Sequence, residues 1–156
     1  LSESAIDPRL LELEITESVA MLDAGFMTDL LNQIKSRGIS IAVDDFGVGY
    51  SPLSYLHTLP LDVVKVDRSF IRQITKPCGS LPVVHTITVL AHHRGLEVVA
   101  EGVETEGELE LVRAARCDLV QGYLIGLPMS AVDLAGLMAA PERLAVHTQA
   151  RAASSY

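Results

Sequence analysis

The feature that most constrains the fold is a regular alternation of short aliphatic segments with longer segments of helical spacing. The aliphatic segments, each expected to form a strand, are 10–15, 39–43, 61–66, 96–100 and 118–121. Helical spacing of apolar residues is found over 18–37, 81–94, 106–116 and 131–140. Because strands that alternate with helices are typical of βαβ units, this order predicts an α/β fold with a parallel sheet.

The predicted helix over 18–37 has a defined apolar side and a defined end. Leu30, Leu31 and Ile34 are spaced so that they lie on one side of it. Gly38 follows the last periodic residue, as at many helix C-termini. The helix is therefore expected to end immediately before this glycine.

The composition indicates an aliphatic core and argues against a nucleic-acid partner. Apolar residues make up 49% of the 156-residue chain but aromatic residues only 4%, so Val, Leu, Ile and Ala must fill the core. The formal net charge is -8, and such a chain does not attract DNA or RNA through its overall field. If it acts on a phosphate compound, a divalent cation held by carboxylates would supply positive charge.

Several features of the sequence predict a cytoplasmic protein. Cys78 and Cys117 form no CxxC motif, so reduced thiols are expected rather than a disulfide or a zinc site. No segment approaches the length of about 20 apolar residues that a membrane-spanning helix needs, and no signal peptide opens the chain. The first residue is Leu1, which indicates a longer reading frame whose other parts could include a membrane anchor.

Polar side chains gather where the predicted strands end. In parallel sheets and barrels, chemistry is carried out at the C-terminal ends of the strands, and all five predicted strands end in acids, a lysine or a carboxamide. These residues are Glu14 and Glu17, Asp44 and Asp45, Lys65 and Asp67, Glu101 and Glu104, and Gln121. A single acid at such a place is more often a helix cap or a turn residue, but the coincidence over five strands favours a site.

The neighbouring pair Asp44 and Asp45 indicates a metal. Adjacent strand residues point to opposite faces, so two acids in a row converge only where the strand is ending. Converging carboxylates repel unless a cation lies between them. With Glu14 and Glu101 nearby, the oxygen ligands suit Mg²⁺ or Mn²⁺, and two metals would suit in-line attack on a phosphodiester. Lys65 could reach a phosphate oxygen or the attacking water.

Two glycines, Gly47 and Gly49, follow the acid pair. They predict either a tight turn or a loop whose backbone approaches a ligand closely. The third glycine of a dinucleotide-binding fingerprint is missing. The two interpretations are equally compatible with these residues.

Taken together, these motifs resemble the EAL domain family, whose members hydrolyse cyclic di-GMP. The resemblance rests on the strings at 14–18, 44–51, 65–67, 101–105 and 121–123, which occur in the family's order and spacing. It implies a TIM-type (β/α)8 barrel that converts cyclic di-GMP to linear pGpG with two Mg²⁺ or Mn²⁺ ions. It also implies a homodimer and an attached sensor or GGDEF domain.

The resemblance also implies a role for each motif residue. Glu14, Asp44, Asp45 and Glu101 would be metal ligands, with Glu101 also near the attacking water. Lys65 would orient that water or stabilise charge on the phosphate, and Gln121 would support the same site. Glu17 would anchor the loop that holds Gly47 and Gly49, while Asp67 and Glu104 would support the ligands.

The chain departs from the family pattern mainly at its front. The Glu-Ala-Leu string and a later Asn, both metal ligands in the family, are absent, and about three strands of the barrel are absent with them. Smaller departures are Val48, Pro52, Leu124 and Leu127. Residues 1–141 are therefore expected to form a partial barrel that is inactive by itself, followed by a loose tail over 142–156. The alternative is an inactive EAL-like module that binds cyclic di-GMP or a protein partner.

Overall fold

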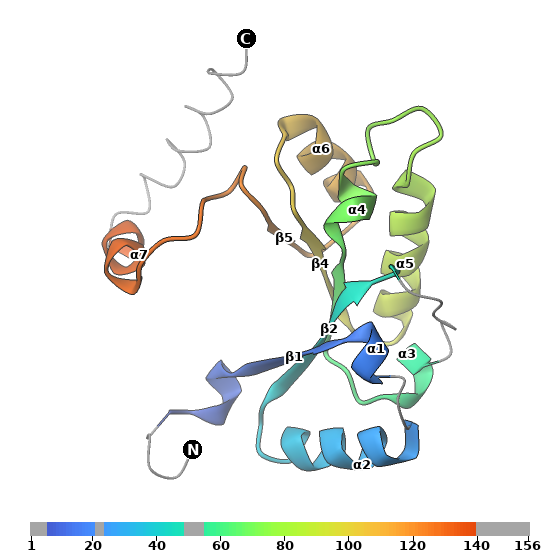
Figure 1. Cartoon of the computed structure of the whole chain (residues 1–156), viewed down its shortest axis with the longest axis vertical. Coiled ribbons are helices and arrows are strands. Elements are labelled where there is room, and N and C mark those ends of the chain that lie inside the picture. The colour runs from blue at the N-terminus through green and yellow to red at the C-terminus, as the bar shows by residue number, and fades with distance from the viewer. Residues whose placement is uncertain (1–5, 21–23, 49–54, 140–156) are drawn as a thin grey trace.

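The computed structural model describes residues 6–20, 24–48 and 55–139. Five strands and seven α-helices are defined in these ranges, together with one short 3-10 helix (Figure 1). In chain order they are η1 (Pro8–Leu10), β1 (Glu12–Thr16), α1 (Glu17–Ala20), α2 (Ala24–Lys35), β2 (Ser40–Phe46), α3 (Tyr55–Thr58), β3 (Val63–Val66), α4 (Arg68–Ile71), α5 (Leu81–His93), β4 (Glu97–Glu101), α6 (Glu106–Ala114), β5 (Leu119–Gln121) and α7 (Ala131–Met138).

The five strands form one parallel sheet in the order β1-β2-β3-β4-β5, as the alternation of elements predicts. Each strand pairs with the next along the chain, so each connection crosses over to the adjacent position. All five C-terminal ends therefore lie along the same edge of the sheet. Both outer strands, β1 and β5, have one neighbour each among the described residues, so this sheet is open rather than closed into a barrel.

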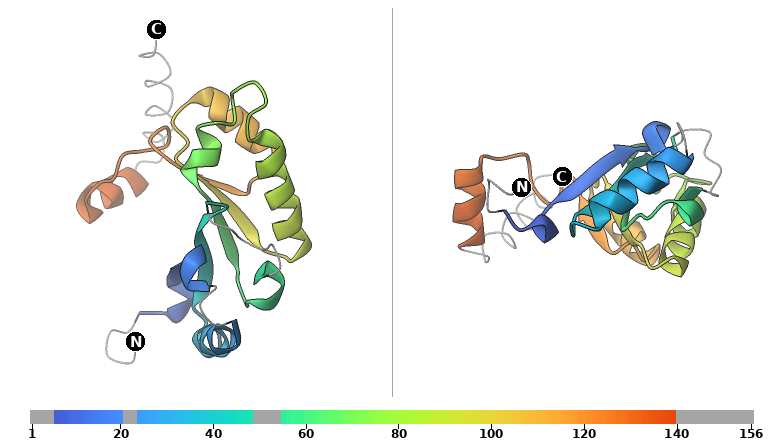
Figure 2. Two further views of the ribbon diagram at one scale, coloured as in Figure 1. Left: turned by 45° about the vertical axis from the view of Figure 1, so that its right-hand side comes forward. Right: turned by 90° about the horizontal axis from the view of Figure 1, so that it is seen from below.

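The two faces of the sheet carry different side chains. One face is covered by helices and carries an aliphatic core that includes Val43, Val64, Val66, Val98 and Ala100, all but fully buried. Helices α5 and α6 lie beside each other on this side of the sheet (Figures 1 and 2). The opposite face receives the alternate residues of every strand, and there the sequence places charged and polar groups.

Helix α2 packs two of its three predicted apolar residues against the core, since Leu31 is buried and Ile34 is partly buried. Met27 and Leu31 are its buried apolar residues, whereas Leu30 is 37% exposed. The prediction for Leu30 was wrong because the buried stripe follows an i, i+4 step along one face, and Leu30 lies about 100° from Leu31. The helix ends at Lys35, and Gly38 follows with φ of 87°.

Two aspartates join the sheet to the helices at the N-terminal ends of the strands. Asp62, which precedes β3, accepts hydrogen bonds from the backbone N–H of Ile41 at 3.0 Å and from Lys35 at 2.7 Å. Asp118, which precedes β5, likewise accepts one from the backbone N–H of Val98 at 2.8 Å. The edge opposite the polar strand ends is thus held by side chain–backbone bonds.

Helix α7 stands apart from the helix layer, on the other side of the sheet (Figure 2). Ser130 caps it by accepting a hydrogen bond from the Asp133 N–H, but none of its residues is buried. The tail predicted over 142–156 lies outside the described residues. None of the described helices has both the length and the apolar composition that crossing a bilayer requires.

Candidate metal centre at the strand ends

The sheet places five of the predicted site residues on the face opposite the helix layer. Parallel pairing sets Glu14 beside Ala42 and Asp44 beside Thr16, so these acids occupy neighbouring strands. The same alternation assigns to this face the residues of the next three strands. They are Lys65, Glu101 and Gln121, and the last two are direct partners in the register.

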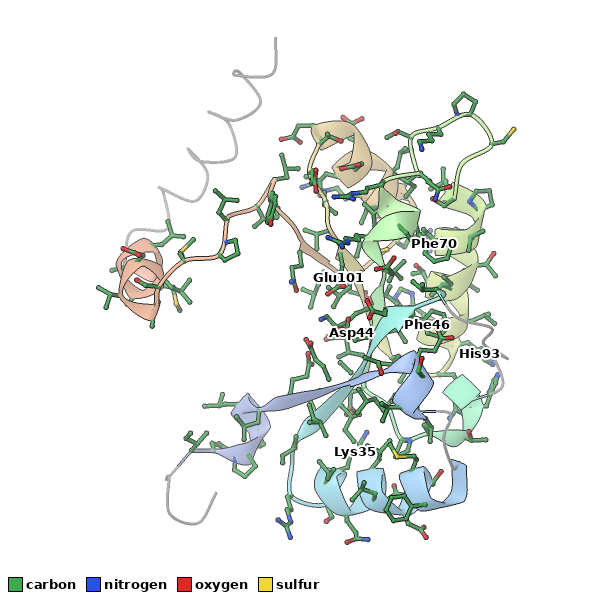
Figure 3. All side chains as sticks on the ribbon, viewed as in Figure 1. Lys35, Asp44, Phe46, Phe70, His93 and Glu101 are labelled. Carbon is green, nitrogen blue, oxygen red and sulfur yellow. The ribbon has the colours of Figure 1, made fainter. Side chains whose placement is uncertain are left out.

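Lys65 lies at the centre of the acidic residues. Its Nζ atom is 2.7 Å from Glu14 Oε1, 2.8 Å from Glu101 Oε1 and 3.3 Å from Asp44 Oδ1. The Lys65 side chain is only 7% exposed and that of Glu101 17%. One buried ammonium therefore holds together carboxylates from three strands, and Asp44 and Glu101 can be located in Figure 3.

The site shifts the pKa values of two of its members. Burial opposes the charge on Lys65, but hydrogen bonds to Glu101 and Glu14 and the charge of Asp44 outweigh it and raise the pKa of the ammonium. Burial raises the pKa of the Glu101 carboxyl as well, and the hydrogen bond from Lys65 does not fully offset this effect. Lys65 is thus a permanent cation, and Glu101 is more basic than an ordinary glutamate.

Asp44 and Asp45 converge because strand β2 is irregular at this point. Strand β2 continues through Asp44 and Asp45 to Phe46, so it is longer than the 39–43 predicted. Its register with β3 shifts between Val43 and Phe46, and Asp45 has a left-handed backbone with φ of 54°. Such irregularities re-aim side chains, which is how two adjacent residues contribute to one cluster.

The resulting cluster fits a divalent cation. One carboxylate oxygen from each of Asp44, Asp45 and Glu101 lies within 4.8 Å of the others. Asp44 Oδ1 is buried and makes no hydrogen bond with a described residue, although Lys65 approaches it. A buried acceptor without a hydrogen bond calls for a further partner, and an oxygen-only donor set suits a hard cation. The group does not include Glu14, which instead contacts Lys65.

The loop after β2 is attached to the site by Glu17 and Phe70. Glu17 is 5% exposed, and its Oε2 accepts a hydrogen bond from the backbone N–H of Gly47 at 2.9 Å. A Cβ atom added at Gly47 would lie 2.7 Å from the Phe70 ring. Close packing and a φ of 98° therefore both require glycine here. Gly49 and Pro52 lie outside the described residues.

The remaining predicted residues lie around the cluster rather than in it. Asp67 caps α4 by accepting a hydrogen bond from the Ser69 N–H at 2.8 Å. Glu104 pairs with Arg72 at 3.2 Å. Gln121 is exposed and lies beside Glu101 in the register. Helix α4, which was not predicted from the sequence, lies between two of these contacts, because Asp67 caps its start and Arg72 at its C-cap pairs with Glu104.

Two cavities flank α4. The smaller, about 260 Å³, is lined by Glu101, Gln121 and Tyr123 together with Arg68 and Arg72. The larger, about 510 Å³, lies beside Asp45 and Val48 and shares the same two arginines. Neither arginine was predicted from the sequence, although their i, i+4 spacing directly after Asp67 indicates that they share a helix face.

Comparison with known proteins identifies relatives of this site. The chain matches the EAL domain family over residues 1–128. It is 42% identical over 135 residues to the cyclic di-GMP phosphodiesterase NbdA of Pseudomonas aeruginosa. It is 41% identical over 134 residues to MucR of the same organism, named a bifunctional diguanylate cyclase/cyclic di-GMP phosphodiesterase. These matches cover 85% and 86% of the chain but only 17% and 20% of the relatives, so the chain spans about a fifth of their length.

Solved structures give the same result for the fold. The phosphodiesterase of MucR in complex with c-di-GMP superposes with a TM-score of 0.81 at 41% identity, covering 86% of this chain and 54% of that one. BlrP1 of Klebsiella pneumoniae, solved as a manganese/cy-diGMP complex, gives 0.77 at 31% identity, covering 82% and 33%. The expected TIM-type fold is confirmed, and the described sheet is a partial barrel.

Proposed function

This chain belongs to the EAL domain family, and from that premise we propose that it provides most of the metal site of a cyclic-di-GMP phosphodiesterase. The reaction would open cyclic di-GMP to linear pGpG. The observation that carries the proposal is the convergence of Asp44, Asp45 and Glu101, whose oxygens lie within 4.8 Å of one another beside the buried Lys65. Neither a helix cap nor a surface acid pair requires this geometry.

The metal would be held by the acids of three strands. Asp44, Asp45 and Glu101 are the proposed ligands, and Glu14 is a further candidate from β1 on the same face. Mg²⁺ or Mn²⁺, two ions in the intact domain, would supply positive charge to the phosphodiester and to the developing charge of the transition state. The donor set of carboxylate oxygens supports these ions over softer metals.

Two residues of the chain have separate roles in the proposed reaction. The Glu101 carboxylate accepts a proton from water as the water oxygen bonds to phosphorus, a role suited to its raised pKa. The phosphorus–O3′ bond breaks, and the 3′ oxygen leaves with the bonding pair and takes a proton from solvent. Lys65, which remains charged, orients Glu101 and stabilises negative charge on the phosphate. The product has one 5′-phosphate and one free 3′-hydroxyl.

The surrounding assembly is part of the same proposal. We propose a homodimer of the intact domain and a sensor or GGDEF domain joined to it, in the cytoplasm. The bifunctional name of MucR supports the second feature. Residues 1–141 would be the portion of the domain that this chain contributes, with 142–156 as a tail.

Hydrolysis of cyclic di-GMP by the full product of the gene tests the proposal. With Mg²⁺ or Mn²⁺ present, the wild type is expected to form pGpG, and the Asp44→Ala, Asp45→Ala double variant is expected to form none. A protein with Asp29→Ala and Asp133→Ala is a matched control, since both acids lie on α2 and α7, away from the cluster. Retained nucleotide binding without turnover in the wild type would instead support a signalling effector.

A further inference from the structure

Arg68 stands out among the cationic side chains near the site. Lys65 is bonded to Glu14 and Glu101, and Arg72 is paired with Glu104. Arg68, by contrast, is exposed, and its guanidinium makes no hydrogen bond or ion pair with any residue in 6–20, 24–48 or 55–139. A guanidinium offers five donors in a planar fork that matches phosphate oxygens. Arg68 is therefore a cation available for a ligand.

The fold fixes Arg68 beside the metal cluster. It is the first residue of α4, directly after the capping residue Asp67. On the other side it packs against Gly102, where an added Cβ atom would lie 2.5 Å from the Arg68 Cβ. Gly102 follows the proposed ligand Glu101 in the chain. The base of the Arg68 side chain is thus held next to the proposed metal ligand.

Both cavities beside α4 include Arg68 in their walls. The smaller contains Glu101 and Gln121, and the larger contains Asp45. Arg68 and Arg72 are the only cationic residues that line the smaller cavity within the described chain. A ligand that reaches from Glu101 or Asp45 along the walls of either cavity meets Arg68.

Cyclic di-GMP has two phosphodiesters, and the metal cluster accounts for only one of them. The cleaved phosphodiester must lie at the acids, where bound cations and Lys65 offset its charge. The second phosphodiester keeps its negative charge on a protein whose formal net charge is -8. A cation at the edge of the site would offset that charge. Arg68 lines both cavities, whereas Lys76 lines only the larger one.

We infer that Arg68, supported by Arg72, binds the second phosphodiester of cyclic di-GMP, the one that is not cleaved. The inference rests on the proposed function, because it assigns a specificity residue to the same site. Arg68 would favour substrates with two phosphates over simple phosphodiesters. Arg72, one helical turn further on and partly neutralised by Glu104, would contribute less.

The experiment compares two substrates, using the full product of the gene. Cyclic di-GMP carries two phosphodiesters, whereas bis(p-nitrophenyl) phosphate carries only one. In Arg68→Ala the KM for cyclic di-GMP is expected to rise about tenfold or more, the effect of losing one charged hydrogen-bond pair. Hydrolysis of bis(p-nitrophenyl) phosphate is expected to remain within about twofold of wild type. Arg68→Lys is expected to recover part of the loss, and Arg113→Ala, an exposed arginine on α6, is the control.

The outcomes separate this inference from the proposed function. Equal losses on both substrates, or none on either, would overturn the role of Arg68 while leaving the phosphodiesterase intact. If the wild type binds cyclic di-GMP without hydrolysing it, binding is measured in place of the KM. The Kd of Arg68→Ala is then determined for cyclic di-GMP and for GMP. The variant is expected to lose affinity for cyclic di-GMP only. If the wild type neither binds nor hydrolyses cyclic di-GMP, the proposed function fails and the inference fails with it. Circular dichroism confirms folding, and Arg68→Gln replaces Arg68→Ala if that variant unfolds.

Discussion

Lys65 and Glu101 lie 2.8 Å apart on the neighbouring strands β3 and β4, and the same ammonium also bonds to Glu14 on β1. The side chain of Lys65 is only 7% exposed. A buried cation surrounded by acids stabilises the site as a unit, because each carboxylate that it neutralises would otherwise repel the others.

Removal of Lys65 is therefore expected to destabilise the protein substantially. Lys65→Met should lower the free energy of unfolding by about 3 kcal/mol, since it leaves the partly buried carboxylates of Asp44 and Glu101 without a counter-ion. Added Mn²⁺ should restore part of the loss. Urea denaturation measures both effects. Lys35→Met is the control, because the Lys35–Asp62 pair is about one-third exposed on each side and should be worth less than about 1 kcal/mol. Equal losses in the two variants would contradict the central role of Lys65.

Gly102 and Gly95 form a matched pair for testing how α4 is positioned. Both have left-handed backbones, with φ of 71° and 72°. An added Cβ meets Arg68 at Gly102 but nothing within 4 Å at Gly95. Gly95→Ala is expected to cost about 1 kcal/mol from backbone strain alone.

Gly102→Ala is expected to cost more than Gly95→Ala by about 1–3 kcal/mol, because overpacking adds to the same strain. It should also reduce cyclic di-GMP hydrolysis, since Arg68 and Glu101 both adjoin it. Thermal unfolding and kinetics of the two variants measure these effects. Indistinguishable variants would show that the close approach of α4 has no energetic consequence.

Glu17 is expected to act through the loop after β2. Glu17→Ala removes the acceptor of the Gly47 N–H and should cost about 1–3 kcal/mol, the penalty for an unpaired donor that is partly buried. Glu17→Gln keeps an acceptor oxygen and should cost less. The Mn²⁺ concentration for half-maximal hydrolysis should rise in the first variant. Glu110→Ala on the exposed side of α6 is the control. An equal loss of stability in Glu110→Ala would contradict the role of Glu17 in holding the loop.

The environment of Asp118 leads us to expect a pH dependence of stability that does not involve the metal centre. Burial opposes the charge of Asp118, but hydrogen bonds from His92 and the Val98 N–H outweigh it and lower the pKa of the carboxyl. A lowered pKa means that the folded state favours the carboxylate. The added stability is therefore present above the unfolded pKa of about 3.9 and is lost as the pH falls through the folded value.

Asp118→Asn is accordingly expected to be less stable than wild type at pH 6, by less than about 1 kcal/mol because the pair is partly exposed. This difference should disappear as the pH is lowered below about 3.9. Urea denaturation between pH 3 and 7 measures it, with Asp29→Asn as the control. A difference that persists or grows at low pH would contradict the lowered pKa.

The site residues that lie at the C-terminal ends of strands could be predicted from the sequence. Parallel strands converge at one edge, so Asp44, Lys65 and Glu101 could be grouped from their positions alone. The way Asp45 joins them could not be predicted. It depends on a left-handed aspartate and a register shift. Neither can be recognised locally, because positive φ remains uncommon at aspartate even though aspartate adopts it more often than most residues.

Helix α4 was missed for a different physical reason. It spans only Arg68–Ile71, too short for an apolar period to be visible, and it is fixed by contacts to glycines distant in sequence. Its arginines could have been noticed by their spacing, but their place beside Glu101 depends on the crossover connections of the sheet. Tertiary contacts therefore decide the part of the site that local patterns do not.

The most direct test is Mn²⁺ binding to the full product of the gene, measured by calorimetry without nucleotide. The Asp44→Asn, Asp45→Asn variant is expected to lose at least about a hundredfold in affinity, since even groups that only support ligands cost about 10–100-fold. The Asp29→Asn, Asp133→Asn variant, with the same change of charge, should bind as the wild type does. Equal affinity in all three proteins would contradict a metal centre at the strand ends.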